Sequence, residues 1–204
     1  MRFSSFALAA FSLGSAFAAP AVQQTEPRAL EILASVSTTI ENTKAVVDVE
    51  LKSLLNLALN VTVTTNLVPQ LEQTILAIVG DVNQIVSVVG PLVNQGTLNL
   101  VEAELQGLPV LLQNVLGLTT NIQSTVQQVI SHLGQDQLQA VQPELQLLLS
   151  SVEPAVKPLI SFALGAVANI TGDLNIQVNN VVGLLQNVLK GLLPTVLGVV
   201  GGIL

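Results

Sequence analysis

His132 is the one side chain in this sequence that could supply an imidazole to catalysis or to a metal. It is the single histidine among the 204 residues, and the chain contains no cysteine. A histidine-paired nucleophile or a multi-histidine metal site would therefore depend on this one ring. Gly134 follows closely and predicts a helix end there. A cation at the C-terminal end of a helix interacts favourably with the helix dipole, so we predict a structural role for His132.

Paired carboxylates are the next chemistry to consider, because glycosidases use two of them as acid and base. Asp48 and Glu50 are two residues apart on a predicted helix, and so are Glu102 and Glu104. Residues two apart on a helix point to different sides. We therefore predict that these carboxylates are ordinary solubilising charges and not an acid/base pair.

The segment 173–179 alternates polar and apolar residues in a way that resembles the ligand spacing of a calcium loop. Such a loop needs glycine at its sixth position and glutamate at its twelfth, and this chain has Val178 and Leu184 there. Neither a phosphate-binding glycine loop nor a nucleophile-elbow motif occurs in the sequence. We predict no catalytic residues, no metal site and no cofactor, and hence a protein that is not an enzyme.

The N-terminus has the features of a secretory signal peptide. Arg2 supplies the positive charge, and the apolar run from Phe6 to Phe17 is too short to span a bilayer. Small residues then predict cleavage near Ala18 or Ala19. We expect a signal peptide over residues 1–18 and a flexible leader over residues 19–28. An N-terminal membrane anchor is the alternative.

Charge and glycosylation signals limit the partners of the exported chain. Cleavage removes one of the six basic residues and leaves thirteen carboxylates. No basic residue lies between Lys52 and Lys157, so no cluster is available to bind the phosphates of nucleic acid. Sequons at Asn60 and Asn169 are candidate N-glycosylation sites and agree with secretion to the extracellular space.

Apolar residues recur at alternating steps of three and four from Leu33 to Val196, which is typical of amphipathic helices. The clearest segment begins with Pro69 in its first turn and is expected to end at Gly90 and Pro91. The next stripe continues in phase through Pro109, which predicts one kinked helix or two helices end to end. A fourth segment is interrupted by three prolines, Pro143, Pro154 and Pro158.

These segments predict a single all-α domain over residues 29–204. Its architecture is an elongated antiparallel bundle of about four to six amphipathic helices, some of them kinked at proline. Residues 55–63 and 173–179 alternate apolar and polar strictly, so strands remain open there, although helix ends or loops are favoured. The apolar run after Lys190 could be a glycolipid-anchor signal, but the polar spacer that such a signal needs is missing. A terminal helix docked into the bundle, with no transmembrane segment in the mature chain, is the favoured interpretation.

The polar faces of the predicted helices carry mainly amides and hydroxyls. An uncharged face loses less solvation than a charged one when it is pressed against wax, lipid or an air interface. The amide side chains concerned are Gln113, Asn114, Gln123, Gln127, Gln128, Gln139, Gln142 and Gln146.

The export signal, the absence of cysteine and the serial Val/Leu stripes from Leu33 to Val196 resemble the fungal hydrophobic surface-binding protein A family and the related cell-wall galactomannoproteins. The resemblance is architectural and compositional and transfers no functional residue. It implies a small, secreted, helical protein associated with apolar surfaces and fatty acids. We therefore expect a non-enzymatic protein that binds hydrophobic surfaces or lipids, free or in a cell wall. A soluble fatty-acid or sterol carrier is the alternative, and a hydrolase is a third hypothesis that export and acidity alone motivate.

Overall fold

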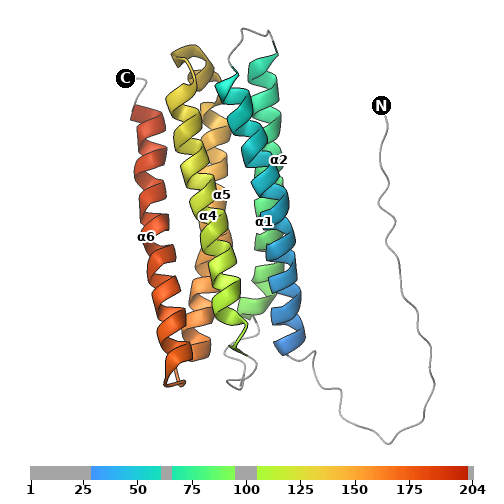
Figure 1. Ribbon diagram of the computed structural model, residues 1–204, viewed down its shortest axis with the longest axis vertical. Coiled ribbons are helices and arrows are strands. Elements are labelled where there is room, and N and C mark those ends of the chain that lie inside the picture. The colour runs from blue at the N-terminus through green and yellow to red at the C-terminus, as the bar shows by residue number, and fades with distance from the viewer. Residues whose placement is uncertain (1–28, 61–65, 95–104, 202–204) are drawn as a thin grey trace, which may run out of the picture.

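The computed structural model describes residues 29–60, 66–94 and 105–201, and this part of the chain folds into five helices without a strand (Figure 1). The prediction of an all-α bundle of four to six helices is confirmed. The helices are α1 (Ala29–Leu59), α2 (Leu67–Asn94), α4 (Leu108–His132), α5 (Gln135–Val167) and α6 (Asp173–Gly201).

The helices stand side by side in two layers, and helices that follow each other in the chain run in opposite directions (Figure 1). One layer contains α1, α4 and α6, and the other contains α2 and α5. The first helix packs against α2 and α4, and α2 also packs against α5. The last helix, α6, packs against both α4 and α5 and completes the bundle. The direct contact between α4 and α5 is less extensive than that between the other pairs of neighbouring helices.

Aliphatic side chains make up nearly the whole core. Phe162 is the one aromatic residue in the described part of the chain, and it is buried. The stripe predicted for the second helix lies in the core along its whole length, with burial at every third or fourth residue. The buried members of that stripe are Leu71, Ile75, Ile78, Val82, Ile85 and Val89.

Proline and glycine end fewer helices than the sequence suggested. The expected stop at Gly90 and Pro91 is wrong, because α2 continues to Asn94. Pro109 lies in the first turn of α4, where a missing N–H leaves no helical hydrogen bond unmade, so it does not kink that helix. The upstream part of that predicted segment, residues 98–104, lies outside the described residues.

The fifth helix, α5, is continuous through its three internal prolines. A proline removes the bond to the carbonyl four residues earlier. These carbonyls belong to Gln139, Ser150 and Pro154, which are all exposed, so water can satisfy them. The outward position of the prolines thus explains how a helix of 33 residues tolerates them.

The strand alternatives are wrong wherever the structure describes them. Residues 55–59 complete α1, and residues 173–179 form the first two turns of α6. Residues 61–63 lie outside the described part. The turn before α6 contains Gly172 at φ 114°, a backbone conformation that favours glycine. Asn175 then donates from Nδ2 to the carbonyls of Val167 (3.2 Å) and Ile170 (2.7 Å), which ties the end of α5 to α6.

Candidate functional site

Two carboxylates on α1 face different helices, as their spacing predicted. Asp48 faces α4, where Asn121 donates from Nδ2 to Asp48 Oδ1 at 2.8 Å. The Lys44 ammonium lies 2.7 Å from the other carboxylate oxygen, Oδ2. Burial alone would raise the pKa of the Asp48 carboxyl, but the hydrogen bonds from Lys44 and Asn121 and the charges of Lys44 and Lys52 outweigh it and lower that pKa. Asp48 is therefore a compensated anion.

A second amide–carboxylate contact lies two helical turns away on the same interface. Asn114 donates from Nδ2 to Glu41 Oε1 at 3.3 Å, and Asn121 donates to Asp48. The donors are seven residues apart on α4 and the acceptors are seven residues apart on α1. Because the offset between donor and acceptor is the same 73 residues in both contacts, α1 and α4 run parallel and in register.

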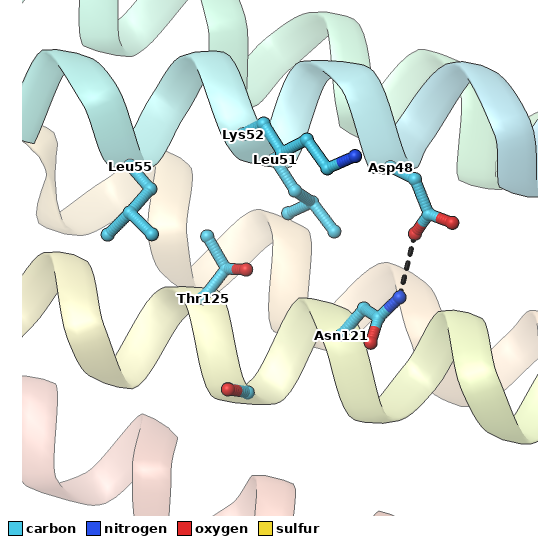
Figure 2. Close-up of a pocket in the computed structure, with 7 residues that line it drawn as sticks. Asp48, Leu51, Lys52, Leu55, Asn121 and Thr125 are labelled. Atoms are coloured by element: carbon cyan, nitrogen blue, oxygen red, sulfur yellow. Dashed lines mark hydrogen bonds between the residues drawn. The ribbon is translucent and has the colours of Figure 1, made fainter.

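A groove of about 330 Å³ continues from Asp48 along the α1/α4 interface (Figure 2). Figure 2 shows α1 side chains on one side of it and Asn121 and Thr125 of α4 on the other. The walls combine two leucines with hydroxyl, amide and charged groups, so the groove is amphipathic. The residues that line it are Asp48, Leu51, Lys52, Leu55, Asn121, Ser124 and Thr125.

Glu50 has the opposite environment, because it faces α2. Its Oε2 atom is buried without a hydrogen-bond partner. Burial, the negative charge of Asp81 and a hydrogen bond with the Asp81 carboxyl raise the pKa of Glu50 to about 7. Asp81 also accepts a hydrogen bond on Oδ1 from Gln84 Nε2 at 3.0 Å. The raised pKa means that the Glu50 carboxyl takes up a proton more readily here than in water.

A second groove, of about 350 Å³, lies between α5 and α6. Ile160 and Leu189 provide its apolar part, and Lys157 and Lys190 provide two positive charges. Lys157 forms an ion pair with Glu153 one turn earlier on α5. Within the described residues Lys190 forms no ion pair. The α5/α6 groove therefore carries a net positive charge on a chain whose formal charge is −7.

The four lysines of the chain all lie at these two interfaces. Lys52 lines the α1/α4 groove, and Lys44 pairs with Asp48 at its end. The remaining two line the α5/α6 groove. No basic residue occurs in α2. The sequence alone does not reveal this distribution, because it depends on which helices become neighbours.

The candidate glycosylation sites lie at exposed ends of helices. Asn60 is exposed just after α1, and its Nδ2 donates to the Asn56 carbonyl at 3.0 Å. The other two residues of its sequon are outside the described part. Asn169 and Thr171 are both exposed in the short turn between α5 and α6. The predicted cleavage region at Ala18 and Ala19 lies outside the described residues.

His132 lies in the last turn of α4, as predicted. The ring is exposed, and its Nδ1 lies 2.7 Å from the carbonyl oxygen of Gln128. A carbonyl can only accept, so Nδ1 carries the proton and caps that carbonyl. In the described ranges no group of three or more His, Cys, Asp or Glu side chains could hold a metal. Glu102 and Glu104 lie outside those ranges.

Two helices are long and apolar enough to span a bilayer by length and composition, namely residues 67–90 of α2 and the whole of α5. Core helices of a water-soluble bundle have the same two properties, and 56% of the α5 span is buried inside the bundle. Comparison with known proteins found no matching family model, no matching curated protein and no matching solved structure.

Proposed function

We propose that this chain is a secreted, non-enzymatic helical protein that binds hydrophobic surfaces or lipids, free or within a cell wall. The supporting observation is α4, which has ten buried residues on one face and no Lys, Arg, Asp or Glu anywhere along its 25 residues. Its outer face is a row of amides and hydroxyls. The exposed polar positions are Gln113, Thr120, Asn121, Ser124, Gln127, Gln128 and Ser131, with His132 at the end.

An uncharged outer face lowers the desolvation free energy that opposes adsorption to an apolar surface. A charged group keeps a large solvation energy that it loses next to an apolar phase, whereas an amide or hydroxyl loses much less. The buried stripes are almost entirely aliphatic, and burial of each Leu or Val contributes about 1.5–3 kcal/mol. That contribution is of similar size whether the partner is another helix or an apolar surface. The helices can therefore exchange internal packing for adsorption at small net cost.

Large apolar residues with substantial exposure are scattered over all five helices, and the most exposed is Val49 at 62%. Apolar-surface binding therefore uses stripes that become available when helices separate. The exposed set is Val46, Val49, Leu59, Leu76, Val110, Leu147, Leu164, Ile176 and Leu184.

The test is adsorption of purified mature protein to octyl-coated beads, with bare silica beads as the reference surface. We expect depletion from solution by the octyl beads alone, together with a lowered surface tension. Circular dichroism after elution shows whether helices persist. Protein that is folded and stays in solution with both kinds of bead would contradict the proposal.

A matched pair of variants tests the role of the α4 face. Gln113→Glu combined with Thr120→Glu adds two charges to exposed positions of α4, and Gln135→Glu combined with Gln139→Glu adds two to exposed positions of α5. Because each buried charge loses solvation energy, we expect at least tenfold weaker adsorption for the α4 variant, a change of roughly 1.4 kcal/mol. Equal loss in both variants would mean that net charge controls adsorption and that the α4 face does not.

A soluble carrier for an anionic amphiphile is a second candidate, because the α5/α6 groove offers lysines beside apolar side chains. The volume of about 350 Å³ lies at the low end of ligand sites in proteins. A carboxylate at Lys190 with its chain along Ile160 and Leu189 fits this arrangement better than an uncharged sterol does. Native mass spectrometry of protein from its own source should then show a bound acid that is lost in Lys190→Glu, whereas clean apo protein would contradict carriage.

N-glycosylation at Asn169 also belongs to the proposal. Both its amide and the Thr171 hydroxyl are on exposed residues, so the sequon is accessible in the folded protein. We expect the mass of the secreted protein to fall on treatment with an N-glycosidase. The variant Asn169→Gln should lack the corresponding part of that change, and Asn60→Gln reports on the other sequon. An unchanged mass in the secreted wild type would exclude glycosylation at both.

A further inference from the structure

Two carboxyl groups, one from each helix, approach each other where α1 packs against α2. Glu50 comes from α1 and Asp81 from α2, and the Asp81 carboxyl is near enough to raise the pKa of the Glu50 carboxyl. Glu50 Oε2 is buried with no partner at all. An unpartnered carboxylate oxygen inside an interface is unfavourable once it is charged, because desolvation is not offset by a donor.

No neighbouring element supplies a compensating charge. Glu72 and Asp81 are the two titratable groups of α2, and both are acidic. On α4, the other neighbour of α1, the one titratable group is His132 at the far end of the helix.

The nearby lysines are directed elsewhere. Lys44 of α1 is paired with Asp48, and Lys52 of α1 lines the α1/α4 groove. On α5, which covers the other side of α2, Lys157 is the one basic residue, and it is paired with Glu153. The other charged residues of α5 are Asp136 and Glu144, which are acidic as well.

We propose that the Glu50–Asp81 pair is a proton-operated latch, which closes α1 onto α2 when protonated and weakens that interface when ionised, so that the apolar stripes become available to hydrophobic surfaces. Binding of the exposed stripes to hydrophobic surfaces rests on the proposed function, whereas the latch itself does not.

The direction of the pH effect follows from proton linkage. In the closed interface the pKa of Glu50 is raised from its ordinary 4.5 to about 7, and in an open interface it returns to the ordinary value. The closed state therefore binds more protons between these two pH values, and its stability falls as the pH rises through this window. Above about pH 7 the loss is complete, and below the ordinary value the latch is fully closed.

The test follows opening directly, by amide hydrogen exchange in α1 and α2 of the full mature protein at pH 4 and pH 8. Rates are corrected for the intrinsic pH dependence of exchange. One unit of pKa shift corresponds to a tenfold change in the opening equilibrium, and partial solvent exposure of Glu50 reduces the full effect. We expect opening to increase roughly tenfold at pH 8 in α1 and α2. Exchange in α5 and α6 should change much less.

The variant Glu50→Gln keeps the shape of the side chain and removes its charge. It should exchange as slowly at pH 8 as the wild type does at pH 4, and Asp81→Asn should have the same effect from the other helix. Glu72→Gln, which neutralises the other carboxylate of α2, should keep the wild-type pH dependence. Persistence of the full pH dependence in both Glu50→Gln and Asp81→Asn would overturn the latch, as would equal exchange at both pH values in the wild type.

Adsorption to octyl beads at the same two pH values tests the functional consequence. If the proposed function holds, wild-type adsorption rises at pH 8 and that of Glu50→Gln does not. A pH-dependent exchange without adsorption at either pH leaves the latch standing and rejects the proposed function. Adsorption that is equal in wild type and Glu50→Gln at both pH values rejects control by the latch and leaves the proposed function standing.

Discussion

The two interfaces of α1 differ in how they treat a carboxylate. On the α4 side Asp48 has a lysine on one oxygen and an amide on the other, at 2.7 and 2.8 Å. On the α2 side Glu50 meets a second carboxyl, and one of its oxygens has no partner. The two residues are separated by one position, so the difference comes from the neighbouring helices and not from local sequence. An acidic bundle can therefore contain one interface that acid weakens and another that base weakens.

The largest expected effect is common to both interfaces, because apolar burial dominates each of them. Ile40 of α1 is fully buried, and Ile40→Ala should lower the free energy of unfolding by about 3 kcal/mol. Urea titration should show the same loss at pH 4 and pH 8. A loss that changed strongly with pH would mean that charge contributes more than packing to the position of α1.

Glu50→Gln should remove the difference between the two interfaces by making the stability of the α1/α2 interface independent of pH. The wild-type carboxyl destabilises the closed bundle above its raised pKa of about 7. Removal of the charge should then raise the free energy of unfolding at pH 8 by about 1–2 kcal/mol, a value reduced from full linkage because the side chain is partly exposed. At pH 4 the urea midpoints of variant and wild type should coincide. Destabilisation at pH 8 would contradict this assignment.

Asp48→Ala should have the opposite sign at neutral pH. Loss of the contacts with Lys44 and Asn121 should cost about 1 kcal/mol, since the site is partly exposed. The pKa of Asp48 is lowered in the folded state, so this contribution is present above the ordinary value of 3.8 and disappears as the pH falls through the lowered pKa. A double-mutant cycle with Asn121→Ala isolates the contact between the two helices. Zero coupling energy between Asp48 and Asn121 at pH 7 would contradict the view that the α1/α4 interface stabilises the charge of Asp48.

Lys157→Ala should have the smallest effect and sharpens the comparison between two ion pairs of equal spacing. The Lys157–Glu153 side chains are 65% and 47% exposed, whereas those of Lys44 and Asp48 are 28% and 24% exposed. Solvent screening leaves little net energy in an exposed pair, so we expect a change within about 0.5 kcal/mol. Thermal unfolding at pH 7 measures it. A loss as large as that of Asp48→Ala would show that exposure does not distinguish the two pairs.

The sequence predicted the fold class well, because helical periodicity of apolar residues is a local property. Leu71, Ile75 and Ile78 lie in the core as their spacing indicated. Helix boundaries were less predictable. Gly90 and Pro91 do not end α2, and the three prolines of α5 lie toward solvent, where the freed carbonyls can be hydrated.

The candidate site was only half predictable. The divergence of Asp48 and Glu50 follows from helix geometry, but the partner of each depends on the order of helices in the bundle. Asp81 lies 31 residues after Glu50, and no local pattern connects the two. The absence of basic residues from the second helix was a usable signal, because an acidic group in a helix without cations can meet another acidic group uncompensated.

The most direct test of opposite charge environments on α1 is carboxyl-carbon NMR of the folded mature protein, titrated from pH 2 to pH 9. The Glu50 carboxyl should titrate with a midpoint near 7, and the Asp48 carboxyl should titrate below its ordinary value of 3.8. A Glu50 midpoint at the ordinary value of 4.5 would contradict the account.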